Sequence, residues 1–176
     1  HPVVYSDFIT KVQFYGGTED TTRKLVQTLS DIYTTSCVKH VVQYGHSHDQ
    51  ESYTTESQFE SQMQHFVQKI ETATRDANQF LFIQSGLLEI NLKSKNSHHR
   101  DHPNFYQFAA SHIAQPDIIF LITQNDDVKD RQMIGELKLR NIPYVYLTGS
   151  FETQLEQIDL ILNKYSKFMN LMDLNI

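Results

Sequence analysis

The sequence predicts an α/β fold in three layers, with a central parallel sheet of about five strands covered by helices on both faces. Short apolar runs alternate with longer segments of helical periodicity along the whole chain, which is typical of this class. The run 79–84 is apolar on both of its faces, as expected for a strand in the middle of a parallel sheet. The run 118–122 is the clearest buried strand of the chain.

The first strand, 12–15, is followed by a helix at 20–33. The apolar positions of this helix fall at spacings of one, three and four, so they form one face: Leu25, Val26, Leu29, Ile32 and Tyr33. A second short strand is expected at 37–42. The polar segment 43–54 that follows it is predicted to be a loop.

Thr55 and Gln58 have the spacing of a capping box, so they predict the start of a long helix that runs to about Arg75. Its buried stripe is expected to contain Phe59, Met63, Phe66, Val67, Ile70 and Ala73. The remaining elements follow the buried strand at 79–84. They are a short helix at 87–92, a polar loop at 94–103, a helix at 104–114, a strand at 118–122, a helix at 126–140, a strand at 144–147 and a final helix capped by Ser150.

The chain has 176 residues, which is enough for one domain with a substantial core, and we expect a single domain over 11–176. The sequence begins with His1 rather than Met, and residues 1–10 resemble a linker from an upstream domain. We therefore expect a fragment of a longer chain.

Composition excludes several classes of function. The net charge of −6, with scattered basic residues, argues against a nucleic-acid-binding surface. No apolar run approaches the roughly 20 residues that a membrane helix needs, so no membrane partner is expected. Cys37 is the single cysteine, which rules out a disulfide framework and a thiolate metal site and fits a cytoplasmic protein.

A glycine pair stands between the first strand and the first helix, which is the layout of a phosphate-binding loop. The phosphate-loop pattern G-x-x-x-x-G-K-[ST] nevertheless fails. Counted from Gly16, Thr21 stands for the second glycine, Thr22 for the lysine and Arg23 for the hydroxyl residue. The cofactor-binding candidates are therefore a degenerate loop: Gly16, Gly17, Thr18, Thr21, Thr22 and Arg23.

The chain resembles the ribosylnicotinamide kinase domain of NadR-type proteins, a branch of the P-loop nucleoside kinases. The family loop G-G-E-S-S-G-K-S-T aligns without gaps on residues 16–24, and the match resumes in the helix 59–73 and the strand 81–83. It continues through the sequence His-Pro-Asn-Phe at 102–105 and ends in the strand 117–122. The resemblance implies a P-loop kinase fold over most of the chain.

The departures from this family fall on its functional positions. The family's loop lysine and hydroxyl residue, which serve the phosphates and Mg²⁺, are Thr22 and Arg23 here. The acidic D-T-D after the third strand is replaced by Gln84-Ser85-Gly86, and Lys39 stands where the family has the acid of E-Y-x-R. The arginine-bearing lid is shortened, with Arg131 as a remnant. If the domain were active, Lys39, Gln84 and Arg131 would be its substrate residues.

Two histidine clusters invite a metal interpretation. His46 and His48 lie close to Asp49, and the run 98–102 brings three further histidines close to Asp101. Both clusters fall in predicted polar loops, where histidines are often merely exposed, and His102 has a family counterpart that is not a metal ligand. We assign no metal site and no catalytic residue, and we interpret Cys37 as a small buried residue.

Three functions remain open, and the third is a regulatory or scaffold domain within a larger NAD-related protein. The first is a pseudoenzyme that has lost ATP and Mg²⁺ and is kept as a structural, regulatory or ligand-sensing module. Its partners would be proteins or the rest of a longer chain, self-association is open, and no nucleic acid is expected. The second is a divergent nicotinamide riboside kinase that uses ATP and Mg²⁺, with Arg23 or Lys24 in place of the loop lysine.

Overall fold

The computed structural model describes residues 9–39, 55–98, 100–123 and 127–174. Five strands form one sheet in the order β2-β3-β1-β4-β5, and every neighbouring pair is parallel. The predicted α/β architecture is confirmed. The strands are β1 (Thr10–Gly16), β2 (Cys37–Val38), β3 (Phe80–Gln84), β4 (Ile118–Ile122) and β5 (Val145–Leu147).

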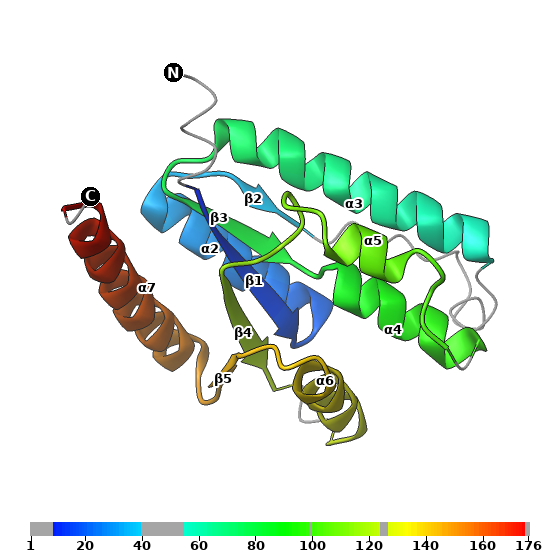
Figure 1. Cartoon of the computed structure of the whole chain (residues 1–176). Helices are drawn as coiled ribbons and strands as arrows, with labels where there is room; N and C mark the ends of the chain where they lie inside the picture. Colours follow the sequence, from blue (N-terminus) through cyan, green and yellow to red (C-terminus); the bar gives the residue numbers. More distant parts are fainter. Residues whose placement is uncertain (1–8, 40–54, 99, 124–126, 175–176) are drawn as a thin grey trace.

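Helices cover both faces of the sheet, as Figure 1 shows. On one face Val12 and Phe14 of β1 pack in a core with α2 and α7. On the other face Tyr15 packs in a second core with α3, α4, α5 and α6. The helices are α2 (Glu19–Tyr33), α3 (Glu56–Asp76), α4 (Leu87–His98), α5 (Phe105–Ala109), α6 (Asp127–Leu139) and α7 (Phe151–Leu174).

The predicted helix caps are confirmed where the structure describes them. Thr55 and Gln58 form a complete capping box, with both reciprocal hydrogen bonds, at the start of α3. The Ser150 hydroxyl accepts a hydrogen bond of 3.2 Å from the Thr153 N–H at the start of α7. Residue 126, where the helix predicted at 126–140 begins, and the loop 43–54 lie outside the described residues.

Two helices differ in length from the prediction. α4 has 12 residues and continues through the first part of the segment predicted as a polar loop, where Lys95 binds Glu136 of α6 at 2.6 Å. α5 has only five residues, because Ser111 and Ala114 close turns with carbonyls three residues earlier instead of extending the helix.

Ile32 is exposed, although the sequence places it on the apolar face of α2. It lies in the last turn of the helix and has 59% of its surface exposed, whereas Leu25, Val26 and Leu29 of the same face are buried. Among the described residues, no helix is both long enough and apolar enough to cross a membrane.

The strand order reverses between the neighbouring strands β1 and β3, because the chain passes from β1 toward the β2 edge and from β3 back across β1 to β4. In parallel sheets, ligands bind beyond the carboxyl ends of the strands at such a reversal. Gly16 is the last residue of β1 at this edge and Gly17 follows it, and Gln84 is the last residue of the neighbouring β3. The fold therefore brings these predicted site residues together.

Candidate functional site

The glycine pair forms a tight turn against the end of β4. Gly16 and Gly17 have positive φ angles of 79° and 68°, which glycine adopts at little cost. The Gly17 N–H donates a hydrogen bond of 3.0 Å to the Ile122 carbonyl. A Cβ atom on Gly16 would lie 2.2 Å from the same carbonyl oxygen. Both glycines are thus required by the local backbone.

The helix begins earlier than the phosphate-loop pattern would place it. In the P-loop arrangement the helix begins at the end of the G-x-x-x-x-G-K-[ST] motif, after the glycine-rich loop. Here α2 begins at Glu19, the fourth position of the motif, after the N-cap residue Thr18. The Thr18 hydroxyl accepts from the Thr21 N–H at 3.2 Å, and its carbonyl accepts from the Thr22 N–H at 3.0 Å. These two N–H groups bond within the helix end instead of facing a cradle for phosphate.

Thr22, at the position of the family lysine, closes the turn from inside. Its side chain is buried, with 2% of its surface exposed, and its hydroxyl donates to the Gly16 carbonyl at 3.1 Å. Its Oγ1 atom would lie 2.3 Å from a Cβ on Gly17. This hydroxyl occupies space that a phosphate loop leaves open, and Thr22 brings no charge to the turn.

The two basic residues after Thr22 interact with other side chains of the protein. Arg23 pairs with Glu19, one helical turn earlier, and its Nη1 lies 3.6 Å from an Asp20 carboxylate oxygen. The Lys24 ammonium lies 4.6 Å from the centre of the Phe151 ring on α7. Glu19 and Asp20 place two carboxylates at the helix N-terminus, where a phosphate would otherwise bind.

The end of β3 contributes neutral groups to this edge. The Gln84 side-chain amide donates a hydrogen bond of 2.9 Å to the Glu19 carbonyl, so it stabilises the first turn of α2. Gln13, in the middle of β1, donates from its amide to the Ser85 carbonyl at 2.6 Å. Gln84, Ser85 and Gly86 therefore support the turn, and they bring no carboxylate to it.

A carboxylate reaches the turn from a position that sequence reasoning missed. Glu89, in the first turn of α4, is half-buried, and its carboxylate accepts hydrogen bonds from the Ser85 hydroxyl and the Gly16 backbone N–H. Burial raises the pKa of Glu89 to about 7, although these two hydrogen bonds act in the opposite direction. The same carboxylate and, above all, burial raise the pKa of the Tyr15 phenol. An acid of the chain itself thus sits where a phosphate loop would meet an anion.

Lys93 lies one helical turn after Glu89 on α4 and interacts with the charges of Lys129 and Glu19. Burial, together with repulsion from Lys129 of α6, lowers the pKa of Lys93 to about 7, and attraction to Glu19 acts against this change. These charged side chains come from three helices, α2, α4 and α6, and they lie near the carboxyl edge of the sheet.

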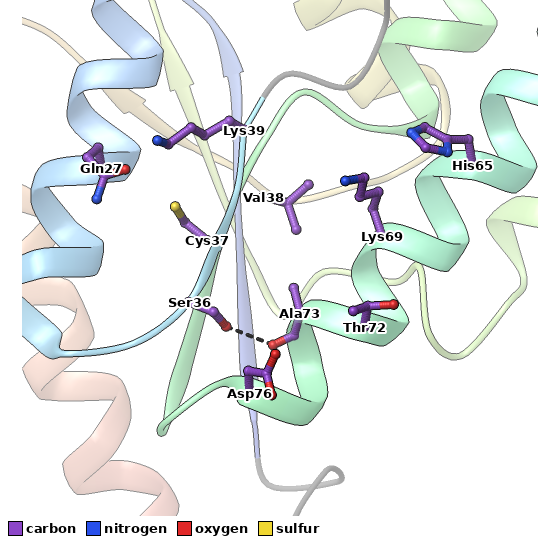
Figure 2. A pocket seen from close by; sticks show the side chains of 10 residues that line it. All are labelled: Gln27, Ser36, Cys37, Val38, Lys39, His65, Lys69, Thr72, Ala73 and Asp76. Atoms are coloured by element: carbon purple, nitrogen blue, oxygen red, sulfur yellow. Dashed lines mark hydrogen bonds between the residues drawn. The ribbon is translucent and has the colours of Figure 1, made fainter.

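Lys39 is placed apart from the glycine turn. It follows β2, which β3 separates from β1, and it lines a groove of about 590 Å³ between α2 and α3. Figure 2 shows Lys39 on the Gln27 side of β2, with Lys69 and His65 on the α3 side. The Ser36 hydroxyl donates to a carbonyl of α3 at 2.7 Å and ties the lower part of this groove together.

The remaining predicted site residue, Arg131, is exposed on α6. Part of the predicted lid, residues 124–126, lies outside the described residues. The structure therefore brings together the six loop residues and Gln84, with Glu89 added, but Lys39 lies two strands away from the glycine turn, after β2.

The metal interpretation can be examined in part. The side chains of His46, His48, His98 and His99 lie outside the described residues. His102 is buried, and its Nδ1 accepts from the Asn104 N–H at 3.1 Å, so it has a structural role. In the described parts of the chain, no group of three His, Cys, Asp or Glu residues could hold a metal ion.

Comparisons with known proteins identify the fold. No family model matches the sequence, and no curated protein matches it either. Among solved structures, NadR in complex with NR is similar with a TM-score of 0.72 and 13% identity, over 91% of this chain and 50% of that chain. The chain thus spans half the length of that NadR chain.

Two further solved structures are similar. A deoxyadenosine kinase from M. mycoides has a TM-score of 0.58 at 11% identity, over 88% of this chain and 100% of that chain. A thymidylate kinase from Ehrlichia chaffeensis has a TM-score of 0.54 at 14% identity, over 87% and 98% of the two chains. The chain therefore has a NadR-like P-loop kinase fold.

Proposed function

We propose that this domain is a NadR-like P-loop kinase fold that has lost ATP and Mg²⁺ binding and is kept as a structural, regulatory or ligand-sensing module. Phosphoryl transfer depends on positioning the phosphates and on neutralising their charge with a metal and cations. The domain would then act through protein partners or through the rest of a longer chain.

The observation that carries this proposal is the closed glycine turn. Thr22 replaces the phosphate-binding cation with a hydroxyl that bonds to Gly16, and Glu89 accepts the Gly16 N–H. A polyphosphate entering this site would meet the acidic side chains of Glu19, Asp20 and Glu89, the last with a pKa raised to about 7. It would have to displace an internal hydrogen bond without gaining a loop lysine, so binding is expected to be very weak.

Isothermal titration calorimetry with ATP–Mg²⁺ tests the proposal. We expect no saturable heat, and adenosine titrated in parallel separates recognition of the base from recognition of the phosphates. Micromolar affinity for ATP–Mg²⁺ that adenosine lacks would show that the turn still holds phosphate and would refute the proposal.

A second candidate function, a nucleoside kinase acting on nicotinamide riboside, is favoured by one observation. Glu89 lies beside the turn with a pKa raised to about 7, and a general base needs such a value near neutral pH. This candidate requires Arg23 to leave its ion pairs with Glu19 and Asp20 and to serve as the cation.

Product analysis separates the two functions. Under the second candidate, nicotinamide riboside and ATP–Mg²⁺ yield a phosphorylated product, and both Arg23→Ala and Glu89→Gln abolish it. The exposed substitution Glu156→Gln on α7 serves as a matched control that keeps the activity. Under the proposed function the wild-type protein gives no product even at high protein concentration.

A further inference from the structure

A pocket of about 270 Å³ lies between β1, β4 and the segment that joins α5 to β4. Its walls come from α4, α5 and the sheet, on the face that carries α3 to α6 (Figure 1). The apolar side chains that define it are Leu88, Phe105, Ala109, Ala114, Ile119 and Ile142. None of the lining residues is charged.

The pocket exists because one wall is built from short turns and small side chains. α5 ends at Ala109, and the chain reaches β4 through turns in which Ala114 lies. This segment is fixed at its far end, where the Asp117 N–H donates to the Lys11 carbonyl at 2.9 Å. Two alanine methyl groups therefore stand where larger side chains would fill the space.

The polar groups in the wall are already engaged. The Gln13 amide donates to the Ser85 carbonyl at 2.6 Å, and the Tyr15 hydroxyl is hydrogen-bonded to the Leu88 backbone. Both side chains are buried. Gln115 is the exposed member of the lining, so the mouth of the pocket lies beside it. A polar ligand would find few hydrogen-bond partners in this pocket, and its polar groups would lose their hydration on binding.

We propose that this pocket binds a small uncharged apolar molecule, of the size of a benzene or indole ring. Small-molecule sites are typically concave and mostly apolar, with few polar groups. An apolar cavity of about 150 Å³ already suffices to bind benzene in another protein, and this pocket is larger, at about 270 Å³. The proposal goes beyond the function proposed above and holds whether or not the glycine turn binds a nucleotide.

Methyl-detected NMR with indole as the probe tests the proposal on the whole chain. We expect saturable shifts of the Leu87, Leu88, Ile119 and Ile142 methyl groups, which line the pocket. Benzoate, a charged ring of similar size to benzene, should bind at least about ten-fold more weakly than benzene, because no charged side chain compensates its desolvation. Equal binding of benzoate and benzene would overturn the assignment of an apolar site.

Two filling variants and one matched control locate the ligand. Ala109→Leu places a larger side chain in the pocket and should abolish indole binding, whereas Ala110→Leu, one residue on and exposed, should leave it unchanged. Ala114→Leu fills the opposite part of the wall, so it decides the matter if Ala109→Leu does not fold. No saturable shift in the wild-type protein, or full binding by a folded filling variant, would overturn the proposal.

Discussion

Replacing Glu89 by Gln tests the role of the carboxylate that contacts the glycine turn. The pKa of Glu89 rises from 4.5 to about 7 in the folded chain, chiefly because of burial. The folded state therefore keeps a proton that the unfolded state loses between these two values. The free energy of unfolding must then fall as the pH rises through this window, and the loss is complete above about pH 7.

The size of the effect follows from the same rise in pKa. At about 1.4 kcal/mol per pKa unit, a change from 4.5 to about 7 corresponds to about 3 kcal/mol. Glutamine has nearly the shape of protonated glutamate and carries no charge at any pH. We therefore expect Glu89→Gln to be close to the wild type near pH 4 and more stable by about 2–3 kcal/mol near pH 8.

Urea unfolding measures this difference in the free energy of unfolding. It is followed by far-UV circular dichroism, because the chain contains no tryptophan whose fluorescence could report unfolding. Glu156→Gln, on the exposed side of α7, is the matched control and should differ little from the wild type at any pH. Lys93 titrates in both proteins, and its lowered pKa makes stability rise with pH above about 7, so only the difference between variant and wild type is informative. A difference that does not grow between pH 4 and pH 8 would show that the Glu89 carboxylate is not buried at the turn, and the reasoning would fail.

Three further predictions use the same unfolding assay. Gly16→Ala should lower the free energy of unfolding by more than about 1 kcal/mol, because the new Cβ would lie 2.2 Å from a carbonyl oxygen at a residue with a positive φ. Gly135→Ala, where the space around the Cβ in α6 is open, should raise it by about 0.5–1 kcal/mol. Equal effects of the two variants would contradict the turn geometry. Arg140→Met removes two ion pairs of 3.1 Å, with Asp101 and Glu136, and should lower the free energy of unfolding by about 3 kcal/mol. The control Arg75→Met removes only an exposed ion pair and should cost less than about 1 kcal/mol. A smaller loss for Arg140→Met than for the control would contradict the buried network. Thr22→Val keeps the shape but removes the hydroxyl bonded to the turn, so it should cost about 1 kcal/mol, and no cost would place that hydroxyl elsewhere.

The order of elements was predictable because it depends on local patterns. Apolar runs of strand length and the capping box at Thr55 identify the sheet and α3 from sequence alone. The lengths predicted for α4 and α5 were wrong, because contacts with other parts of the fold determine where these helices end. The Lys95–Glu136 pair supports the extended α4, and turns at Ser111 end the helical run that the pattern predicted.

The location of the candidate site could be predicted from the sequence, but the arrangement of its side chains could not. The sequence locates the altered loop and Gln84, because carboxyl ends of parallel strands meet at one edge. It does not reveal that Thr22 turns inward or that Glu89 reaches Gly16, since both depend on side-chain packing between helices. One signal could have found Glu89: an acid in the first turn of the helix that follows β3 must lie near the turn after β1. Lys39 was placed with the site by alignment alone, and the sheet order separates it from the turn.

The closed glycine turn is tested most directly by the backbone amides of Gly16 and Gly17 in ¹⁵N NMR spectra during a titration with ATP–Mg²⁺. The Gly16 N–H bonds to Glu89 and the Gly17 N–H to Ile122, so neither amide signal should show a saturable shift at millimolar nucleotide. Saturable shifts of both amides at micromolar nucleotide would mean that the turn opens to hold phosphate, and the account of a closed turn would be wrong.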